Sequence, residues 1–95
     1  MKTSDDIIWF VHSENGKPVG ICGFNKVHEE IVSILVDNNF RRKGIATKLI
    51  KEIEVWAKEN GYKRIFGTVK LENDASNGVF EKLGYEKLNK YEIKF

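Results

Sequence analysis

A run of cations followed by a glycine is the segment of this sequence best suited to chemistry. The cations are Arg41, Arg42 and Lys43. They precede Gly44, and an apolar periodic segment begins at Ile45. At the start of a helix, N–H groups are unpaired and the dipole is positive, so cations are unfavourable there unless an anion is present. Because Gly44 has no Cβ and Ala46 is small, successive N–H groups could converge on phosphate oxygens. The same pattern alone also fits a solvated basic loop.

Apolar periodicity predicts the elements that would position this segment. Expected strands cover residues 7–11, 19–24, 30–36 and 63–69, expected helices cover 45–57 and 74–83, and residues 85–95 form one bent strand or a tight hairpin. Asn15-Gly16 suits the turn between the first two strands, and Asn60-Gly61 suits the end of the first helix.

The resulting order is β-β-β-α-β-α-β. Strand-helix-strand connections imply a parallel pair with a right-handed crossover, here joined to an antiparallel N-terminal meander. We therefore expect a mixed sheet with helices, of the α/β (α+β) class, in one domain spanning residues 1–95.

Composition excludes several classes of protein. With 95 residues, a two-domain enzyme is excluded, and a net charge of +2 is too small to argue for nucleic acid or membrane. No apolar run reaches the roughly 18 residues that cross a bilayer, and the polar start does not resemble a signal peptide. The single cysteine, Cys22, fits a reducing compartment and a packing role. These features predict a soluble cytoplasmic protein. His12 and His28 have no ligands at metal spacing, so no metal site is expected.

Two segments resemble one known family. The pattern Arg41-x-x-Gly44-x-Ala46, after the loop aromatic Phe40, resembles the acyl-CoA signature of the GNAT superfamily of N-acetyltransferases. Residues 71–85 look like the later motif of that family, in which an Asn begins the second helix and a Tyr-Glu-Lys-Leu-Gly-Phe run ends it. The resemblance extends from Trp9 to the C-terminus and implies a GNAT-like fold.

The resemblance implies a V-shaped opening between the strands at 30–36 and 65–69, which receives the pantetheine arm of acetyl-CoA. The residues it assigns to acetyl-CoA are Ile34, Leu35 and Val36 for the pantetheine amides, Arg41, Arg42, Lys43, Gly44, Ile45 and Ala46 for the pyrophosphate, and Asn73 with Phe80 on the far side near the thiol.

The reaction implied is direct attack of a primary amine on the thioester, which needs a base because an alkylamine has a pKa near 10.4. The family often has a glutamate where this chain has Val32, so Glu30 or Glu29 would substitute. Phe80 stands where the family has a tyrosine that donates to the thiolate. Tyr85 and Tyr91 could replace it, although Tyr85 aligns with an aromatic that normally packs in the core.

Only six residues precede Ile7, whereas family members usually carry about 40 to 50 more on the acceptor side. Three explanations are open: a partner subunit such as a homodimer, a bulky protein amine acceptor, or a fragment of a longer enzyme. The main functional expectation is an N-acetyltransferase acting on a small-molecule or protein amine. The alternatives are an acyl-CoA-binding module with little catalysis and a small nucleic-acid-binding domain.

Overall fold

The computed structural model describes residues 6–41, 43–67, 74–88 and 90–95. Its elements are β1 (Ile7–Glu14), β2 (Lys17–Asn25), β3 (Glu30–Val36), a short 3-10 helix η1 (Asn38–Phe40), α1 (Ile45–Glu59), β4 (Arg64–Gly67), α2 (Asp74–Lys82), β5 (Glu86–Lys87) and β6 (Tyr91–Lys94). The expected order of elements is confirmed, and the C-terminal segment takes the hairpin form, with β5 antiparallel to β6.

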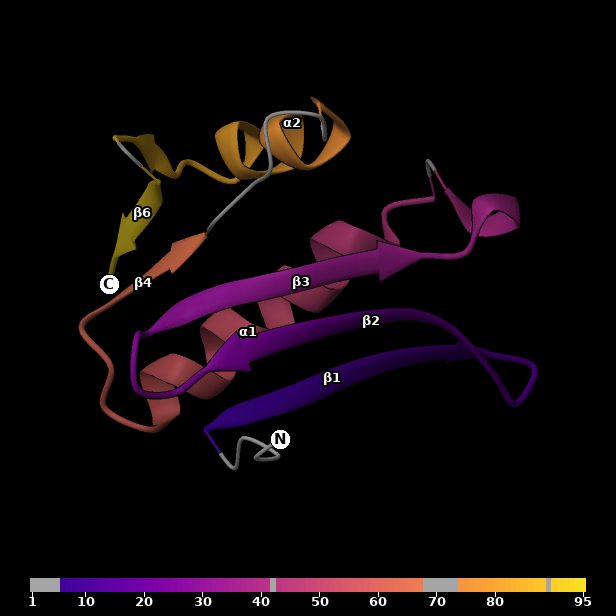
Figure 1. Ribbon diagram of the computed structural model, residues 1–95, viewed down its shortest axis with the longest axis horizontal. Coiled ribbons are helices and arrows are strands. Elements are labelled where there is room, and N and C mark those ends of the chain that lie inside the picture. Colours follow the sequence, from indigo (N-terminus) through magenta and orange to yellow (C-terminus); the bar gives the residue numbers. More distant parts are fainter. Residues whose placement is uncertain (1–5, 42, 68–73, 89) are drawn as a thin grey trace, which may run out of the picture.

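The strands form one six-stranded sheet in the order β1-β2-β3-β4-β6-β5 (Figure 1). β3 and β4 are parallel, and the other neighbouring strands are antiparallel. The mixed sheet with an N-terminal meander expected from the sequence is therefore confirmed. α1 forms the connection between the parallel strands, as a right-handed crossover requires.

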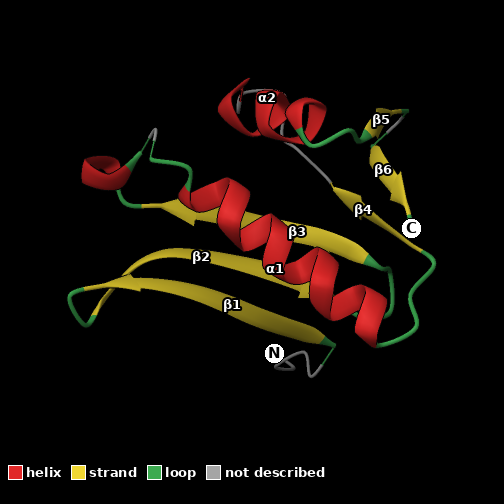
Figure 2. Cartoon of the chain, turned by 180° about the vertical axis from the view of Figure 1, so that it is seen from behind, coloured by secondary structure: helices red, strands yellow, loops and turns green. Residues whose placement is uncertain are grey.

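Local sequence explains the first hairpin and the first helix. Asn15 and Gly16 both have positive φ, 51° and 79°, as a two-residue hairpin turn requires. α1 presents an apolar face to the sheet (Figure 2), and Leu49, Ile50 and Ile53 on this face are fully buried. The helix ends at Asn60, whose N–H contacts the last carbonyls, and Gly61 follows with φ 83°.

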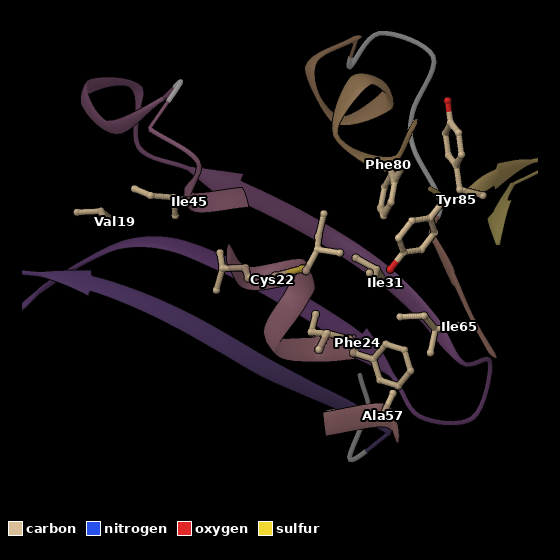
Figure 3. Close-up of a cluster of buried hydrophobic side chains, with 13 residues drawn as sticks. Val19, Cys22, Phe24, Ile31, Ile45, Ala57, Ile65, Phe80 and Tyr85 are labelled. Atoms are coloured by element: carbon tan, nitrogen blue, oxygen red, sulfur yellow. The ribbon is translucent and has the colours of Figure 1, made fainter. Parts of the chain in front are cut away.

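The core lies between α1 and the sheet and extends to α2 (Figure 3). Phe24 of β2 packs edge-on against Trp56 of α1, with ring centroids 5.6 Å apart. At the other end of α1, a Cβ added to Gly20 would lie 2.7 Å from the Cγ2 atom of Ile45 and 3.3 Å from the Cδ1 atom of Leu49. Glycine at this position therefore lets the first turn of α1 lie directly on β2.

The opposite face of the sheet carries exposed apolar side chains. Trp9, Val11 and Leu35 are 52%, 50% and 66% exposed. Register places Val11 beside Ile21 and Ile21 beside Leu35, so one row of apolar residues crosses three strands. A shallow pocket lies at one end of this row, lined by Val11, Pro18, Val19, Gly20, Ile21, Leu35, Val36 and Asp37. Among the described helices, none has the length and apolar content to cross a bilayer.

Candidate functional site

A β-bulge in β3 determines which backbone groups of that strand are free of the sheet. Gly23 pairs with Ser33, but the next residue of β2, Phe24, pairs with Ile31, so Val32 is the extra residue. Before the bulge, the carbonyl of Glu29 accepts a hydrogen bond from the N–H of Phe66 in β4 at 2.7 Å. After the bulge, the N–H of Asp37 donates to the carbonyl of Val19 beside β2 at 2.8 Å. The alternation of main-chain groups thus changes sides at the bulge.

Because of this change, the three β3 residues assigned to the pantetheine arm do not all direct their main-chain groups to the same side of the strand. Because Asp37 pairs toward β2 and antiparallel ladders alternate, Leu35 also directs its main-chain groups toward β2. Ile34 and Val36 direct theirs to the other side, where β3 has no partner among the described strands. In agreement, the carbonyl of Val36 accepts a hydrogen bond from Nε of Arg41 at 3.5 Å. Ile34 and Val36, rather than Leu35, therefore direct main-chain groups away from the described sheet, and the pantetheine role predicted for the three residues stays a prediction.

The unpaired part of β3 begins where its pairing with β4 stops. Within the described residues, the two strands pair only at Glu30 with Phe66 and at Ile31 with Gly67. β4 ends at Gly67, so β3 continues from Val32 to Val36 without a neighbour among the described strands, and α2 lies beyond the end of β4 (Figure 1). The V-shaped opening predicted here involves residues 68 and 69, which lie outside the described residues, and it stays a prediction. We refer to the edge from Val32 to Val36 as the free edge of β3.

The N-terminus of α1 lies next to the end of this free edge. Ile45 begins α1 and packs on Gly20, which is the register partner of Val36. The residue before the helix, Gly44, has φ 77°, and a Cβ added there would meet no atom within 4 Å. Within the part of the chain that the structure describes, no side-chain cap of this helix is seen, and its first turn contains no acidic residue. Its first N–H groups are therefore open to an anion.

Two cations beside this helix end, Arg41 and Lys43, are exposed. Arg41 reaches back to Val36, and Nζ of Lys43 lies 5.1 Å from the centroid of the Phe40 ring. Ile45 is buried, so only its N–H group faces the predicted pyrophosphate, whereas Ala46 is half-buried. The roles predicted for Arg41 through Ala46 stay predictions. Two of the assigned residues, Arg42 and Asn73, lie outside the described residues.

Glu30 lies at the closed end of the free edge, on the sheet face away from α1. Its neighbour Ile31 points into the core and is 1% exposed, so Glu30 points the other way. Its carboxylate accepts a hydrogen bond from Nζ of Lys90 at 3.3 Å. Glu30 lies one residue before the last described pair of β3 and β4, a position that suits a base acting at this end of the free edge, and the role of Glu30 stays a prediction.

The two tyrosines considered as proton donors bond to other groups. The hydroxyl of Tyr85 donates to Oε2 of Glu54 in α1 at 2.7 Å, and that of Tyr91 donates to Oε1 of Glu81 at 3.1 Å. Burial, followed by the hydrogen bond and charge of Glu54, raises the pKa of Tyr85 far above its ordinary value. A hydroxyl held in this way is a poor proton donor. The structure therefore favours the packing role of Tyr85 over the catalytic one.

Phe80 is fully buried, with its ring centroid 5.0 Å from that of Tyr85 and stacked 5.3 Å from that of Tyr91. Gly67 leaves the space that the Phe80 ring fills against β4. The position of Phe80 beside acetyl-CoA stays a prediction.

Sequence reasoning missed a cluster of aromatic and charged side chains beside Glu30. Register places Phe66 of β4 between Glu30 of β3 and Glu92 of β6 on one sheet face. Lys90 and Arg64 lie over the Phe66 ring, 4.4 and 5.2 Å from its centroid. The alternation of residues 64–67 was a usable signal, but the pairing across three strands was not visible in the sequence. Among the described residues, no three His, Cys, Asp or Glu side chains gather as metal ligands would.

Comparison with known proteins agrees with this geometry. A sequence profile of the acetyltransferase (GNAT) family matches residues 2–85. The chain belongs to this family. An uncharacterized N-acetyltransferase of Methanocaldococcus jannaschii is 36% identical to this GNAT chain, over 90% of the chain and 42% of that protein. The chain thus spans less than half the length of this relative.

Solved structures have the same fold as this GNAT chain. The PaiA N-acetyltransferase of Thermoplasma acidophilum, in complex with coenzyme A, gives a TM-score of 0.83 at 17% identity, covering 95% of this chain and 62% of that one. The aminoglycoside N-acetyltransferase AAC(6')-Iy, in complex with CoA, gives 0.79 at 23% identity, covering 88% and 71%. At these identities the likeness shows the fold, which is the GNAT fold.

Proposed function

We propose that this chain is an N-acetyltransferase domain that transfers an acetyl group from acetyl-CoA to a primary amine. The observation that carries the proposal is the free edge of β3 ending beside the uncapped N-terminus of α1. The edge offers the N–H and C=O groups of Ile34 and the N–H group of Val36, whose C=O accepts a hydrogen bond from Nε of Arg41, and the helix offers N–H groups after Gly44. One chemical group that needs both is a chain of amides joined to a diphosphate, which is the composition of coenzyme A.

Each half of this surface fits its part of the cosubstrate. An extended ligand can add to a strand edge through main-chain hydrogen bonds, as a further strand would. A diphosphate is stabilised by the N–H groups and dipole of a helix N-terminus, and Arg41 and Lys43 supply charge at the same place. Acetyl-CoA supplies an activated acyl group, and the relatives in complex with coenzyme A support this choice.

The residues of this chain would then remove a proton from the acceptor. An alkylamine with a pKa near 10.4 is almost fully charged at neutral pH and must lose a proton before it attacks. Glu30, at the closed end of the free edge, is the base that we assign, acting directly or through one water. A base of this kind typically contributes at least about 100-fold to rate.

A second function, binding of acyl-CoA with little catalysis, is favoured by one observation. The hydroxyls of Tyr85 and Tyr91 are bonded to carboxylates, and Phe80 has none. The described part of the chain therefore presents no tyrosine hydroxyl committed to the departing thiolate. Because a thiolate leaves without assistance more readily than most groups, we keep transfer as the first proposal.

Turnover separates the two functions. The purified chain would be incubated with acetyl-CoA and each of three amines: an aminoglycoside, a peptide with an N-terminal alanine, and 1,4-diaminobutane. Thiol release and the mass of the acetylated amine are measured together. Acetylated product above the uncatalysed rate supports the enzyme, whereas acetyl-CoA binding without product from any amine supports the binding module.

The Glu30→Gln variant tests the assignment of the base. We expect its turnover to fall by about 100-fold while acetyl-CoA affinity stays unchanged, because the carboxylate acts on the amine. Glu86→Gln is the matched control, since Glu86 is an exposed glutamate of β5. Equal turnover in both variants would exclude Glu30 as the base.

Location and assembly are also proposals. We place the reaction in the cytoplasm, because the single cysteine fits a reducing compartment. A second copy of the chain over the apolar row of β1, β2 and β3 is one of the three explanations for the open acceptor side. Light scattering of the purified chain tests it.

A further inference from the structure

The cluster around Phe66 has the composition of a site for an alkylammonium ion. Glu30, Phe66 and Glu92 are register partners on three adjacent strands, so two carboxylates flank one aromatic ring on a single sheet face. Carboxylate and aromatic ring are the two groups that bind a primary ammonium in proteins, one by charge and one by the electrons of its face.

The carboxylates and the aromatic ring of this cluster are more buried than its cations. The side chains of Glu30 and Glu92 are only 19% and 7% exposed, and Phe66 is half-buried in a strand. The cations are long and exposed: the side chain of Lys90 is 41% exposed and that of Arg64 is 53% exposed. Both ion pairs are partly buried, and in each the cation is the more exposed member, so water and other cations can reach it. The carboxylates and the ring are therefore the fixed part, and the cations are replaceable.

Lys90 shows how such a ligand would be held. Its Nζ lies 3.3 Å from Oε2 of Glu30 and 4.4 Å from the centroid of the Phe66 ring. A lysine side chain is itself a primary alkylammonium, so this contact is the one that a free alkylamine would make. Its position coincides with the closed end of the free edge of β3, where the proposed reaction takes place.

We propose that Glu30 and Phe66 form the subsite for the ammonium group of the acceptor, and that Lys90 is an internal competitor which the acceptor displaces. The inference rests on the proposed function and specifies its acceptor as a primary amine on an unbranched alkyl carbon. Glu30 then holds the ammonium whose proton it later removes. A neutral molecule of the same shape gains neither the charge nor the cation–π attraction and is rejected.

Displacement of Lys90 lowers the apparent affinity for the ligand, because only the fraction of molecules with a vacated subsite can bind it. We expect the partly buried Lys90–Glu30 pair to fill the subsite in about four of five molecules, so that removal of Lys90 raises affinity by about fivefold. Lys90→Gln removes the competitor, and Lys90→Arg keeps it. Lys87→Gln removes the same charge from an exposed lysine of the same hairpin.

The experiment titrates n-butylammonium chloride into the full chain without acetyl-CoA and follows backbone amide shifts by NMR. We expect shifts at Glu30, Phe66 and Gly67, with a Kd in Lys90→Gln about fivefold below those of the parent, Lys90→Arg and Lys87→Gln. n-Butanol, which is uncharged, should leave these amides unchanged. Adding Glu30→Gln to Lys90→Gln should remove the binding.

Equal Kd values in the parent and Lys90→Gln, or shifts confined to other residues, would overturn the inference. If Lys90→Gln fails to fold, Lys90→Met, which keeps the alkyl stem, takes its place with the same expectation. The titration needs no turnover, so the two proposals fail separately. An absence of acetylated product would contradict the proposed enzymatic function, whereas product formation with equal Kd values would overturn this inference and leave the proposed function standing.

Discussion

Replacing Gly44 with aspartate or with asparagine gives the sharpest test of the anion site. Aspartate and asparagine tolerate the left-handed conformation better than most residues, so the free-energy cost of replacing glycine at φ 77° is similar for the two. They have nearly the same shape and differ by one negative charge. Since a Cβ at this position meets no atom within 4 Å, either side chain fits without repacking.

The expected effect follows from Coulomb's law. A carboxylate about 6 Å from a phosphate charge raises the binding free energy by about 0.7 to 2.8 kcal/mol for effective dielectric constants between about 80 and 20. Because the surroundings of Gly44 are open, we expect a value near 1.4 kcal/mol, which is about a 10-fold weaker Kd. The same charge should stabilise the unliganded helix by about 0.3 to 1 kcal/mol through the dipole.

Thermal unfolding with and without acetyl-CoA measures both effects. At a ligand concentration about 100 times the Kd of Gly44→Asn, that variant gains about 2.7 kcal/mol and Gly44→Asp gains about 1.4 kcal/mol. For a domain of this size, these values correspond to Tm shifts of about 11–22 °C and about 6–11 °C. Without ligand, the Tm of Gly44→Asp should equal or exceed that of Gly44→Asn.

The added charge should stabilise the unliganded protein but weaken acetyl-CoA binding, and these opposite effects distinguish lost binding from a folding artefact. A variant that is at least as stable alone yet gains less from the ligand has lost binding rather than structure. S-acetylpantetheine, which lacks the diphosphate, should stabilise both variants equally. The same acetyl-CoA shift in Gly44→Asp and Gly44→Asn would refute the placement of the diphosphate at this helix end.

Three further predictions concern the scaffold. Gly20→Ala puts a methyl group 2.7 Å from the Cγ2 atom of Ile45 and should lower the free energy of unfolding by about 1 to 3 kcal/mol in urea, and an unchanged midpoint would contradict this. Tyr85→Phe removes the hydrogen bond to Glu54 and should cost about 1.5 to 3 kcal/mol while turnover per folded molecule is kept; lost turnover in a folded variant would restore a catalytic role for Tyr85. Burial raises the pKa of the Cys22 thiol from 9.0 to about 12, so the unfolded chain loses this proton first as pH rises. The contribution of the Cys22 thiol to the free energy of unfolding is therefore fully present below pH 9 and is lost progressively up to about pH 12. At pH 10 the loss is about 1.4 kcal/mol. Cys22→Ala should lack this decline. If the free energy of unfolding in urea depends on pH in the same way for the parent and Cys22→Ala, burial of the thiol does not set the pH dependence.

Local signals in the sequence were sufficient for the elements. The three- and four-residue spacing of Ile45, Leu49 and Ile53 predicted α1, and Asn60-Gly61 marked its end within a residue. The turn at Asn15-Gly16 fixed the first hairpin. These features depend on neighbours close in sequence, so they do not require knowledge of the sheet.

The details of the site depend on pairing between distant strands and could not be predicted in the same way. Val32 is a β-branched residue in a β-branched run, and no glycine or proline marks the bulge. The location of Glu30 beside Lys90 joins residues 60 positions apart. The packing of Phe80 on Gly67 joins residues 13 positions apart, and nothing in the local sequence around either residue predicts it.

The bulge at Val32 leaves the sheet as two leaves joined by a short seam. β1, β2 and β3 form one leaf, β4, β6 and β5 form the other, and within the described strands the seam consists of two register positions. A molecule that binds along β3 and reaches toward β4 would contact both leaves and hold them together. Amide hydrogen exchange should then slow on both sides of the seam, rather than in one leaf alone.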